Sequence, residues 1–297
     1  MCLFVLALLL AAPLRTAPAR QLLTPQKSQP QPEIVVQAAA RFRVTLNGFS
    51  VNNQSDDDIL EGDGKGDEVY VRSDWWKLNK KGVVERRDIT QTKILGDINN
   101  QSDPPRLQAG GAPDGHGGLV TGDKYPRPSN PWARAGVTYP DRLPTVLWEG
   151  QLMQGENMVV IVPTVWEWDN REKSNSEREW EQRINAAFAG RQASLVSSIA
   201  SRDQKNYLNG FSDDERGFVY LGSSAGTRPI GMDAFARDGV SGSIKLAPQA
   251  LTLTYDSALE ATRTSPGNLA PGVFAIRYVD RQDKGDYTLY VQVELIN

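Results

Sequence analysis

The chain has 297 residues, a formal net charge of −3 at pH 7 and one cysteine, Cys2. This length is ample for a hydrophobic core, and without a basic excess the composition excludes a protein that binds nucleic acid by charge. Because Cys2 has no second cysteine to pair with, no disulfide is expected.

The N-terminus has the pattern of a secretory signal peptide. Residues 3–12 are ten consecutive apolar residues, whereas a membrane-spanning helix needs about 20. Ala17-Pro18-Ala19 then places small residues at the two positions that a signal peptidase reads. We therefore expect residues 1–19 to be a signal peptide and the protein to be secreted or periplasmic. The alternative is an ordinary buried N-terminal strand or helix.

Residues 20–40 contain three prolines among Gln, Lys and Ser, which is typical of a flexible leader. The β-rich domain is expected to span 41–297. It begins with Phe42, Val44 and Leu46 alternating with polar residues, and a phase shift at Asn47-Gly48 predicts a bulge. Later candidate strands cover residues 68–72, 153–168, 218–221, 243–246, 251–255, 273–279 and 287–295.

One helix is expected among the strands. Ser176 and Glu179 have the spacing of a capping box, and the apolar residues Trp180, Ile184 and Phe188 follow at helical intervals. Gly190 is expected to end or bend this helix. The fold class predicted is therefore mainly β: an antiparallel β-sandwich, C2-like or immunoglobulin-like, with one inserted helix.

A long Pro- and Gly-rich region occupies residues 102–144 and contains eight prolines. Within a compact domain such a loop is unusual and often functional. The alternative is a linker that divides the chain into two β units.

The strongest chemical pattern is the acidic segment 56–68, which holds seven carboxylates and three glycines between two expected strands. Ca²⁺ takes six to eight oxygen ligands from flexible loops of this kind. A second acidic pair, Glu167 and Asp169, follows an apolar strand, and side chains two apart on a strand point to the same side. The metal ligands predicted are Glu61, Asp63, Asp67, Glu167 and Asp169. The alternative is a solvated acidic hairpin.

At these residues the chain resembles the C2 domain family, a calcium-binding antiparallel β-sandwich. The resemblance comprises Glu61, Gly64-Lys65-Gly66-Asp67 with Tyr70-Val71, and Glu167-Trp168-Asp169. Glu stands at two positions where the family has Asp, and no Pro follows Asp67. The resemblance implies Ca²⁺ as cofactor and a membrane surface as one class of partner.

Catalytic patterns are few. His116 is the only histidine and lies in a glycine-rich stretch, and no Gly-x-Ser-x-Gly elbow exists. A glycoside hydrolase needs only two carboxylates, and Glu167 and Asp169 flanked by Trp166 and Trp168 are the first candidates. The alternative is that most tryptophans are structural, with Trp148, Trp166 and Trp180 in the core and Trp75-Trp76 at a sheet edge.

Three functional hypotheses follow. The leading one is an exported β-sandwich binding protein, calcium-dependent through its acidic loops, and we favour it as a protein that is not an enzyme. The second is a carbohydrate-binding module or carboxylate-pair glycoside hydrolase. The third is a structural envelope protein without a small ligand. The partner classes considered are accordingly carbohydrate, envelope protein and membrane surface.

Overall fold

The computed structural model describes most of the predicted β-rich domain. The described residues are 38–55, 66–96, 106–107, 118–125, 145–168, 173–199, 208–210, 219–221, 227–237, 240–246, 248–280 and 284–296. The predicted signal peptide and nearly all of the predicted leader lie outside these ranges.

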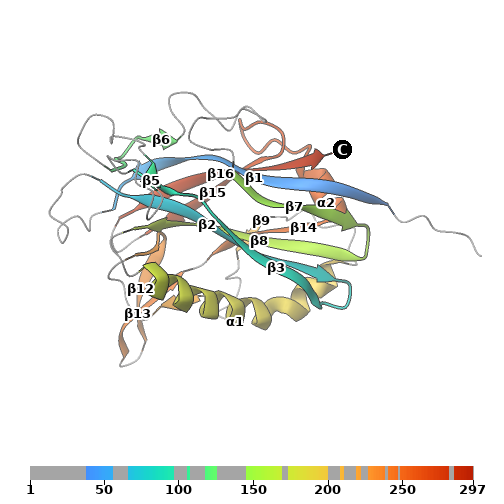
Figure 1. Ribbon diagram of the computed structural model, residues 1–297, viewed down its shortest axis with the longest axis horizontal. Helices are drawn as coiled ribbons and strands as arrows, with labels where there is room; N and C mark the ends of the chain where they lie inside the picture. Colours follow the sequence, from blue (N-terminus) through green and yellow to red (C-terminus); the bar gives the residue numbers. More distant parts are fainter. Residues whose placement is uncertain are drawn as a thin grey trace, which may run out of the picture. The chain divides into compact units, whose positions relative to one another are not determined.

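The described residues form mainly β-structure, and the predicted antiparallel sandwich with an inserted helix is confirmed. Figure 1 shows the two larger sheets as successive layers, with a long helix lying along the second. Strands on either side of residues 102–144 pair with each other in both sheets.

The first sheet has the strand order β15-β16-β1, and β1 also pairs with β6 and β7. Its central strand, β1, begins with the alternation that the sequence predicts. The register of β1 against β16 shifts between Leu46 and Gly48, which confirms the predicted bulge. The bounds are β1 Ala39–Asn53, β6 Lys124–Tyr125, β7 Thr145–Met153, β15 Val273–Val279 and β16 Asp286–Ile296.

The second sheet is built around β2 and β8, which pair in continuous register from Val69 opposite Glu167 to Asn79 opposite Asn157. It extends through β14 to β9 and through β4 to β5, with β3 on β2 and β11 on β8; β4 and β5 are parallel. The bounds are β2 Val69–Asn79, β3 Val84–Gln91, β4 Ile94–Leu95, β5 Arg106–Leu107, β8 Asn157–Glu167, β9 Leu208–Gly210, β11 Arg228–Pro229 and β14 Gln249–Thr254. A smaller sheet joins β10 Val219–Leu221, β12 Met232–Arg237 and β13 Val240–Leu246.

Helix α1, Lys173–Ile199, is the inserted helix that the sequence predicts. It begins before Ser176 and continues through Gly190. It packs on the second sheet through Phe188, whose ring stacks on Trp76 with centroids 4.5 Å apart. A second helix, α2 Tyr255–Ala261, was not predicted; it begins at Tyr255, the last residue of the predicted strand 251–255.

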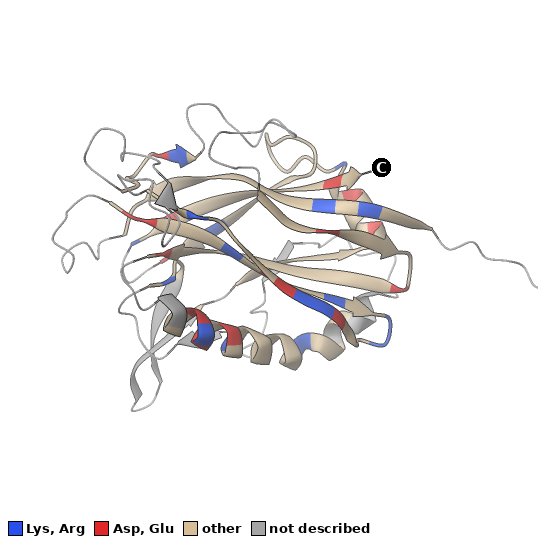
Figure 2. Ribbon diagram, viewed as in Figure 1, with Lys and Arg blue, Asp and Glu red and all other residues tan. Residues whose placement is uncertain are grey.

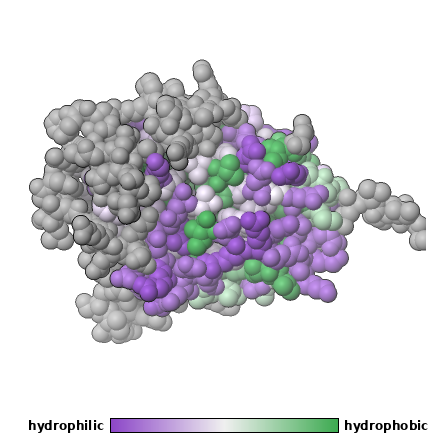
Figure 3. All heavy atoms as spheres, viewed as in Figure 1, coloured by the Kyte–Doolittle hydropathy of each residue, from purple (hydrophilic) through white to green (hydrophobic). Residues whose placement is uncertain are grey.

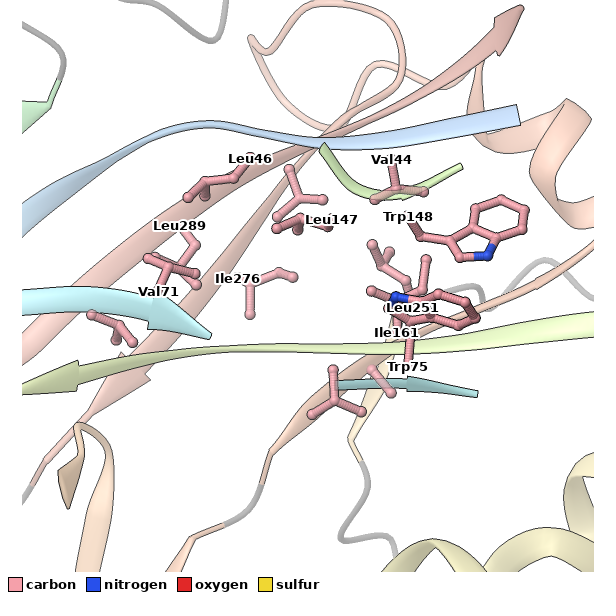
Figure 4. Close-up of a cluster of buried hydrophobic side chains, with 14 of the residues drawn as sticks. Val44, Leu46, Val71, Trp75, Leu147, Trp148, Ile161, Leu251, Ile276 and Leu289 are labelled. Atoms are coloured by element: carbon pink, nitrogen blue, oxygen red, sulfur yellow. The ribbon is translucent and has the colours of Figure 1, made fainter. Parts of the chain in front are cut away.

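The main core lies between the two sheets, and Figure 4 shows side chains from both meeting there. They include Val44, Leu46, Val71, Trp75, Leu147, Trp148, Ile161, Leu251, Ile276 and Leu289.

The prediction that Trp75 and Trp76 lie at a sheet edge is wrong. Strand β2 has β3 on one side and β8 on the other, and both indoles are buried. Because successive side chains of a strand point to opposite faces, Trp75 enters the core between the sheets and Trp76 meets α1. The core positions predicted for Trp148, Trp166 and Trp180 are confirmed.

Candidate functional site

The two predicted acidic segments approach each other at one end of the second sheet. Strand β2 begins just after Asp67, and β8 ends at Glu167, whose backbone pairs with Val69. The Trp168 N–H donates to the Glu68 carbonyl at 2.7 Å. Because β2 and β8 are antiparallel, the start of one and the end of the other share an edge. Figure 2 shows the acidic residues at these two strand ends close together.

Ser55 connects the two carboxylates. Its backbone N–H donates to both oxygens of Asp67, at 3.1 and 3.0 Å, and its hydroxyl donates to Glu167 Oε1 at 2.6 Å. All three residues are buried. Ser55 immediately precedes residues 56–65, and Gly66 follows them. The residues that flank the acidic segment on either side therefore lie next to each other.

Gly66 holds this return in position. Its φ of +92° lies in the left-handed region, and a Cβ there would stand 2.6 Å from the Leu119 carbonyl oxygen. Both facts require glycine at this position. The next residue, Asp67, exchanges two backbone hydrogen bonds with Leu119, at 2.9 and 2.8 Å. The re-entry point is thus fixed by backbone contacts as well as by the Asp67 carboxylate.

Further groups engage the same two carboxylates. The Tyr287 hydroxyl donates to Asp67 Oδ2 at 2.5 Å. The Arg228 guanidinium donates to Asp280 Oδ2 at 2.8 Å and lies 3.4 Å from Glu167 Oε2. Arg228 and Asp280 are buried as well. Asp67 and Glu167 therefore act as acceptors in an internal network, which we name the loop anchor: Ser55, Asp67, Glu167, Arg228, Asp280 and Tyr287.

The side chains that make up this anchor carry more negative than positive charge. Burial raises the pKa of Tyr287 well above its usual value of 10, and the carboxylates of Asp67, Glu167 and Asp123 raise it further. Within the anchor itself, Arg228 is the one positive side chain beside three carboxylates. Such a surplus of negative charge in a poorly solvated region favours a nearby cation.

The hydroxyl of Tyr287 gives a direct test of the anchor. Replacing Tyr287 by Phe is expected to lower the free energy of unfolding by about 1–3 kcal/mol, because Asp67 loses a buried donor. Since the folded state raises the pKa of Tyr287, this stabilisation is complete below pH 10 and is lost as the pH rises through the raised pKa. Urea denaturation of both proteins at pH 7 and above pH 10 measures the difference. An equal loss at both pH values would contradict the assignment.

The predicted metal ligands divide into two groups. Asp67 and Glu167 lie together, but their oxygens already accept hydrogen bonds, and Arg228 supplies the positive charge next to Glu167. These two side chains therefore fit an anchoring role better than direct coordination. Glu61, Asp63 and Asp169 lie outside the described residues. Within the ranges described, no three Asp, Glu, His or Cys side chains form a group that could hold a metal ion.

The sequence patterns did not predict the other residues of the loop anchor. Asp280 directly follows the predicted strand 273–279 and Tyr287 opens the predicted strand 287–295, so each has an ordinary structural explanation. Ser55 and Arg228 match no motif. Their contacts with Glu167 join positions 112 and 61 residues apart, and such pairing depends on the complete sheet order.

The tryptophans near the acidic site are not placed as a sugar-stacking surface. Trp166 is fully buried, with its ring stacked on Tyr70 and edge-on to Trp180. Trp168 is partly buried against the core. On the face shown in Figure 3, hydrophobic residues are scattered among hydrophilic ones. The exposed large hydrophobic side chains in the described part are Val83, Val146, Val279 and Leu295.

Comparisons with protein-family models, with curated proteins and with solved structures give no match to this chain. Neither helix in the described part of the chain is long and apolar enough to cross a membrane.

Proposed function

We propose that this chain is an exported binding protein, without catalytic activity of its own, whose acidic loops bind Ca²⁺ at one end of the β-sandwich. The observation that carries this proposal is the link from Asp67 through Ser55 to Glu167. It brings both ends of segment 56–65 to the point where residues 169–172 leave β8. Two acidic segments that are far apart in the sequence therefore both start next to the contact between Asp67, Ser55 and Glu167.

Chain connectivity limits the distance between the remaining candidate ligands and this contact. Asp63 is three residues from Gly66, and an extended chain spans at most about 3.6 Å per residue. Asp169 follows Trp168 directly, so their Cα atoms are about 3.8 Å apart. Glu61, Asp63 and Asp169 are thus the carboxylates that we assign to Ca²⁺. Asp67 and Glu167 hold the strand ends from which these residues extend.

The surplus of negative charge in the loop anchor supports the same assignment. Segment 56–65, which joins Ser55 to Gly66 in the sequence, adds five carboxylates and a single lysine. Carboxylates crowded in this way repel one another unless water or a cation separates them, and Ca²⁺ accepts six to eight oxygen ligands in flexible geometry. Binding of Ca²⁺ is therefore expected to stabilise the folded protein by relieving this repulsion.

Calorimetric titration of the purified chain with Ca²⁺ tests the proposal. We expect heat of binding and a rise in melting temperature, since a ligand at 100 times its Kd adds about 2.7 kcal/mol to stability. Asp63→Asn and Asp169→Asn are expected to weaken Ca²⁺ binding. Asp88→Asn is the matched control, because Asp88 is an exposed carboxylate on β3.

The possible results distinguish metal ligands from anchoring residues. If Ca²⁺ produces neither heat nor a rise in melting temperature, the chain is not a calcium-binding protein. If Asp67→Asn abolishes binding while leaving stability unchanged, Asp67 is a ligand and the anchoring role is wrong. We expect the opposite for Asp67→Asn: a marked loss of stability, with Ca²⁺ still bound by the remaining carboxylates.

A further inference from the structure

Strand β15 lies at an edge of the first sheet. Among the described strands it pairs only with β16, in continuous register from Val273 opposite Gln292 to Val279 opposite Asp286. The other side of β15 therefore presents backbone N–H and C=O groups that no described strand pairs with. Such an edge is a template for pairing with a strand of another chain.

The contacts at the two ends of β15 show which of its residues face this open edge. The Gly272 carbonyl accepts a hydrogen bond from the Val293 N–H, and the Asp280 N–H donates to the Gly285 carbonyl. Because successive residues of an antiparallel strand direct their backbone groups to opposite sides, the even-numbered residues of β15 bond to β16. The odd-numbered residues face the open edge, and they are Val273, Ala275, Arg277 and Val279.

The side chains of this edge leave it accessible. Ala275, Arg277 and Val279 are exposed, and Val279 is among the exposed large hydrophobic residues of the described part. The Arg277 guanidinium donates to both carboxylate oxygens of Asp286, and its Nε lies 2.8 Å from Oδ1. Since Asp286 lies on β16, this pair draws the guanidinium away from the open side. The Arg277 carbonyl has a long contact with Gln249 Nε2, at 3.5 Å.

Strand β15 also lacks the features by which natural proteins protect a sheet edge. Charged side chains, proline and bulges discourage pairing with a further strand. Strand β15 contains no proline, its register has no bulge, and its one charge is paired with Asp286. Strand β3 gives the contrast: it pairs with β2 alone among the described strands, and residues 85–88 are four consecutive charged residues.

The residues of this edge are complementary to a second copy of themselves. When two β15 strands meet antiparallel about a two-fold axis, the longest overlap is centred on Ile276. Ala275 then faces Arg277 of the second copy, and Val279 faces Val273 of the second copy. A small residue thus lies opposite a long one and valine opposite valine, whereas a register centred on Arg277 would place like charges directly opposite each other. We propose that two copies of this chain dimerise through their β15 edges.

A two-fold contact of this kind closes on itself. Each copy uses the same edge, so no β15 edge remains to recruit a further chain. The contact is small, because β15 has seven residues and a standard interface buries about 800 Å² on each partner. The Val273 N–H is also already bonded to the Ala270 carbonyl at 3.1 Å. The dimer is therefore expected to be weak and to form as the protein concentration rises.

The dimer proposal does not depend on calcium. Residues 273–279 include no member of the loop anchor and no assigned Ca²⁺ ligand. Experiments in EDTA therefore test the β15 edge alone, and their failure leaves the calcium proposal untouched. Calorimetry with Ca²⁺ on the Val279→Lys variant tests the acidic loops in a chain whose edge is blocked.

Sedimentation velocity of the full chain in EDTA, over a wide range of protein concentrations, measures the dimer. Val279→Lys is expected to weaken it about tenfold, because a charge on an edge opposes pairing and each copy adds one lysine. Val83→Lys is the matched control, since Val83 is also an exposed valine but lies between β2 and β3. This variant should dimerise like the unmodified chain.

Ala275→Pro provides a second test, because it removes a backbone N–H that faces the open edge, where proline is tolerated. Circular dichroism checks that each variant is folded. The proposal is overturned if the unmodified chain sediments as a monomer at every concentration, or if Val279→Lys and Val83→Lys dimerise equally well. A dimer that survives Val279→Lys but disappears on removal of residues 20–37 would assign the contact to the predicted leader instead.

Discussion

Replacing Asp74 by Leu is expected to destabilise the folded protein by about 3–5 kcal/mol, because it leaves a buried arginine without its counter-ion. Asp74 is fully buried, accepts two hydrogen bonds from Arg72, and accepts a third from Trp180. Arg87 adds a more distant contact at 3.8 Å. Urea denaturation followed by far-UV circular dichroism measures the loss.

The double variant Arg72→Met/Asp74→Leu distinguishes the cost of leaving one charge uncompensated from the cost of altered packing. Removing both charges together is often nearly neutral, whereas removing one leaves the other uncompensated. We therefore expect the double variant to be more stable than Asp74→Leu alone. Asp88→Ala provides the comparison with an exposed carboxylate: its pair with Arg86 lies at the surface at 3.3 Å, and its loss should cost less than about 1 kcal/mol. A small effect of Asp74→Leu would contradict this account.

The strands were predictable where one face of the sheet is apolar and the other polar. In β16, Tyr287, Leu289, Val291 and Val293 alternate with polar residues, and all four are buried. Leu295 continues the same alternation but is exposed, because the pattern extends to the end of the strand beyond the tightly packed part. The apolar run of β8 also predicted a strand, and it is buried along its whole length.

Two features depend on tertiary packing and were not predictable locally. The residues of β2 give no simple alternation because α1 covers the second face. Tyr70, Arg72, Asp74 and Trp76 all point toward that helix, so polar and apolar residues share one buried face. Helix α2 is too short for a periodic pattern. Its start is set by Thr254 and Ser257, each of which accepts a hydrogen bond from the backbone N–H of the other.

The candidate acidic site was predictable only in part. Asp67 and Glu167 both flank strongly predicted strands, so their meeting required only that β2 and β8 be antiparallel neighbours. Their partners could not be inferred in the same way. Arg228 comes from the two-residue strand β11, which pairs with β8 at Glu167, and Tyr287 comes from the other sheet. Two carboxylates that the sequence predicts as cation ligands can thus accept hydrogen bonds from an arginine and a tyrosine of distant segments.

Replacing Arg228 by Met is expected to destabilise the protein by about 3–5 kcal/mol, because it removes the buried guanidinium that pairs with Glu167 and Asp280. Arg228→Lys should cost less but remain destabilising, since a single ammonium cannot donate to two carboxylates in the fixed geometry of a guanidinium. Arg277→Met is the matched control. Arg277 also pairs with an aspartate, Asp286, but its side chain is largely exposed, so its loss should be much smaller. Equal losses for Arg228→Met and Arg277→Met would show that the loop anchor contributes little.

Adding Ca²⁺ to the Arg228→Met variant distinguishes anchoring carboxylates from metal ligands. If Glu167 only positions the chain, Ca²⁺ binds elsewhere in the loops and stabilises the variant and the unmodified protein by the same amount. If Ca²⁺ restores most of the stability lost in Arg228→Met, the metal replaces the guanidinium and Glu167 is a ligand after all. We expect equal stabilisation, because Asp67 and Glu167 keep their hydrogen bonds from Ser55 when the arginine is removed.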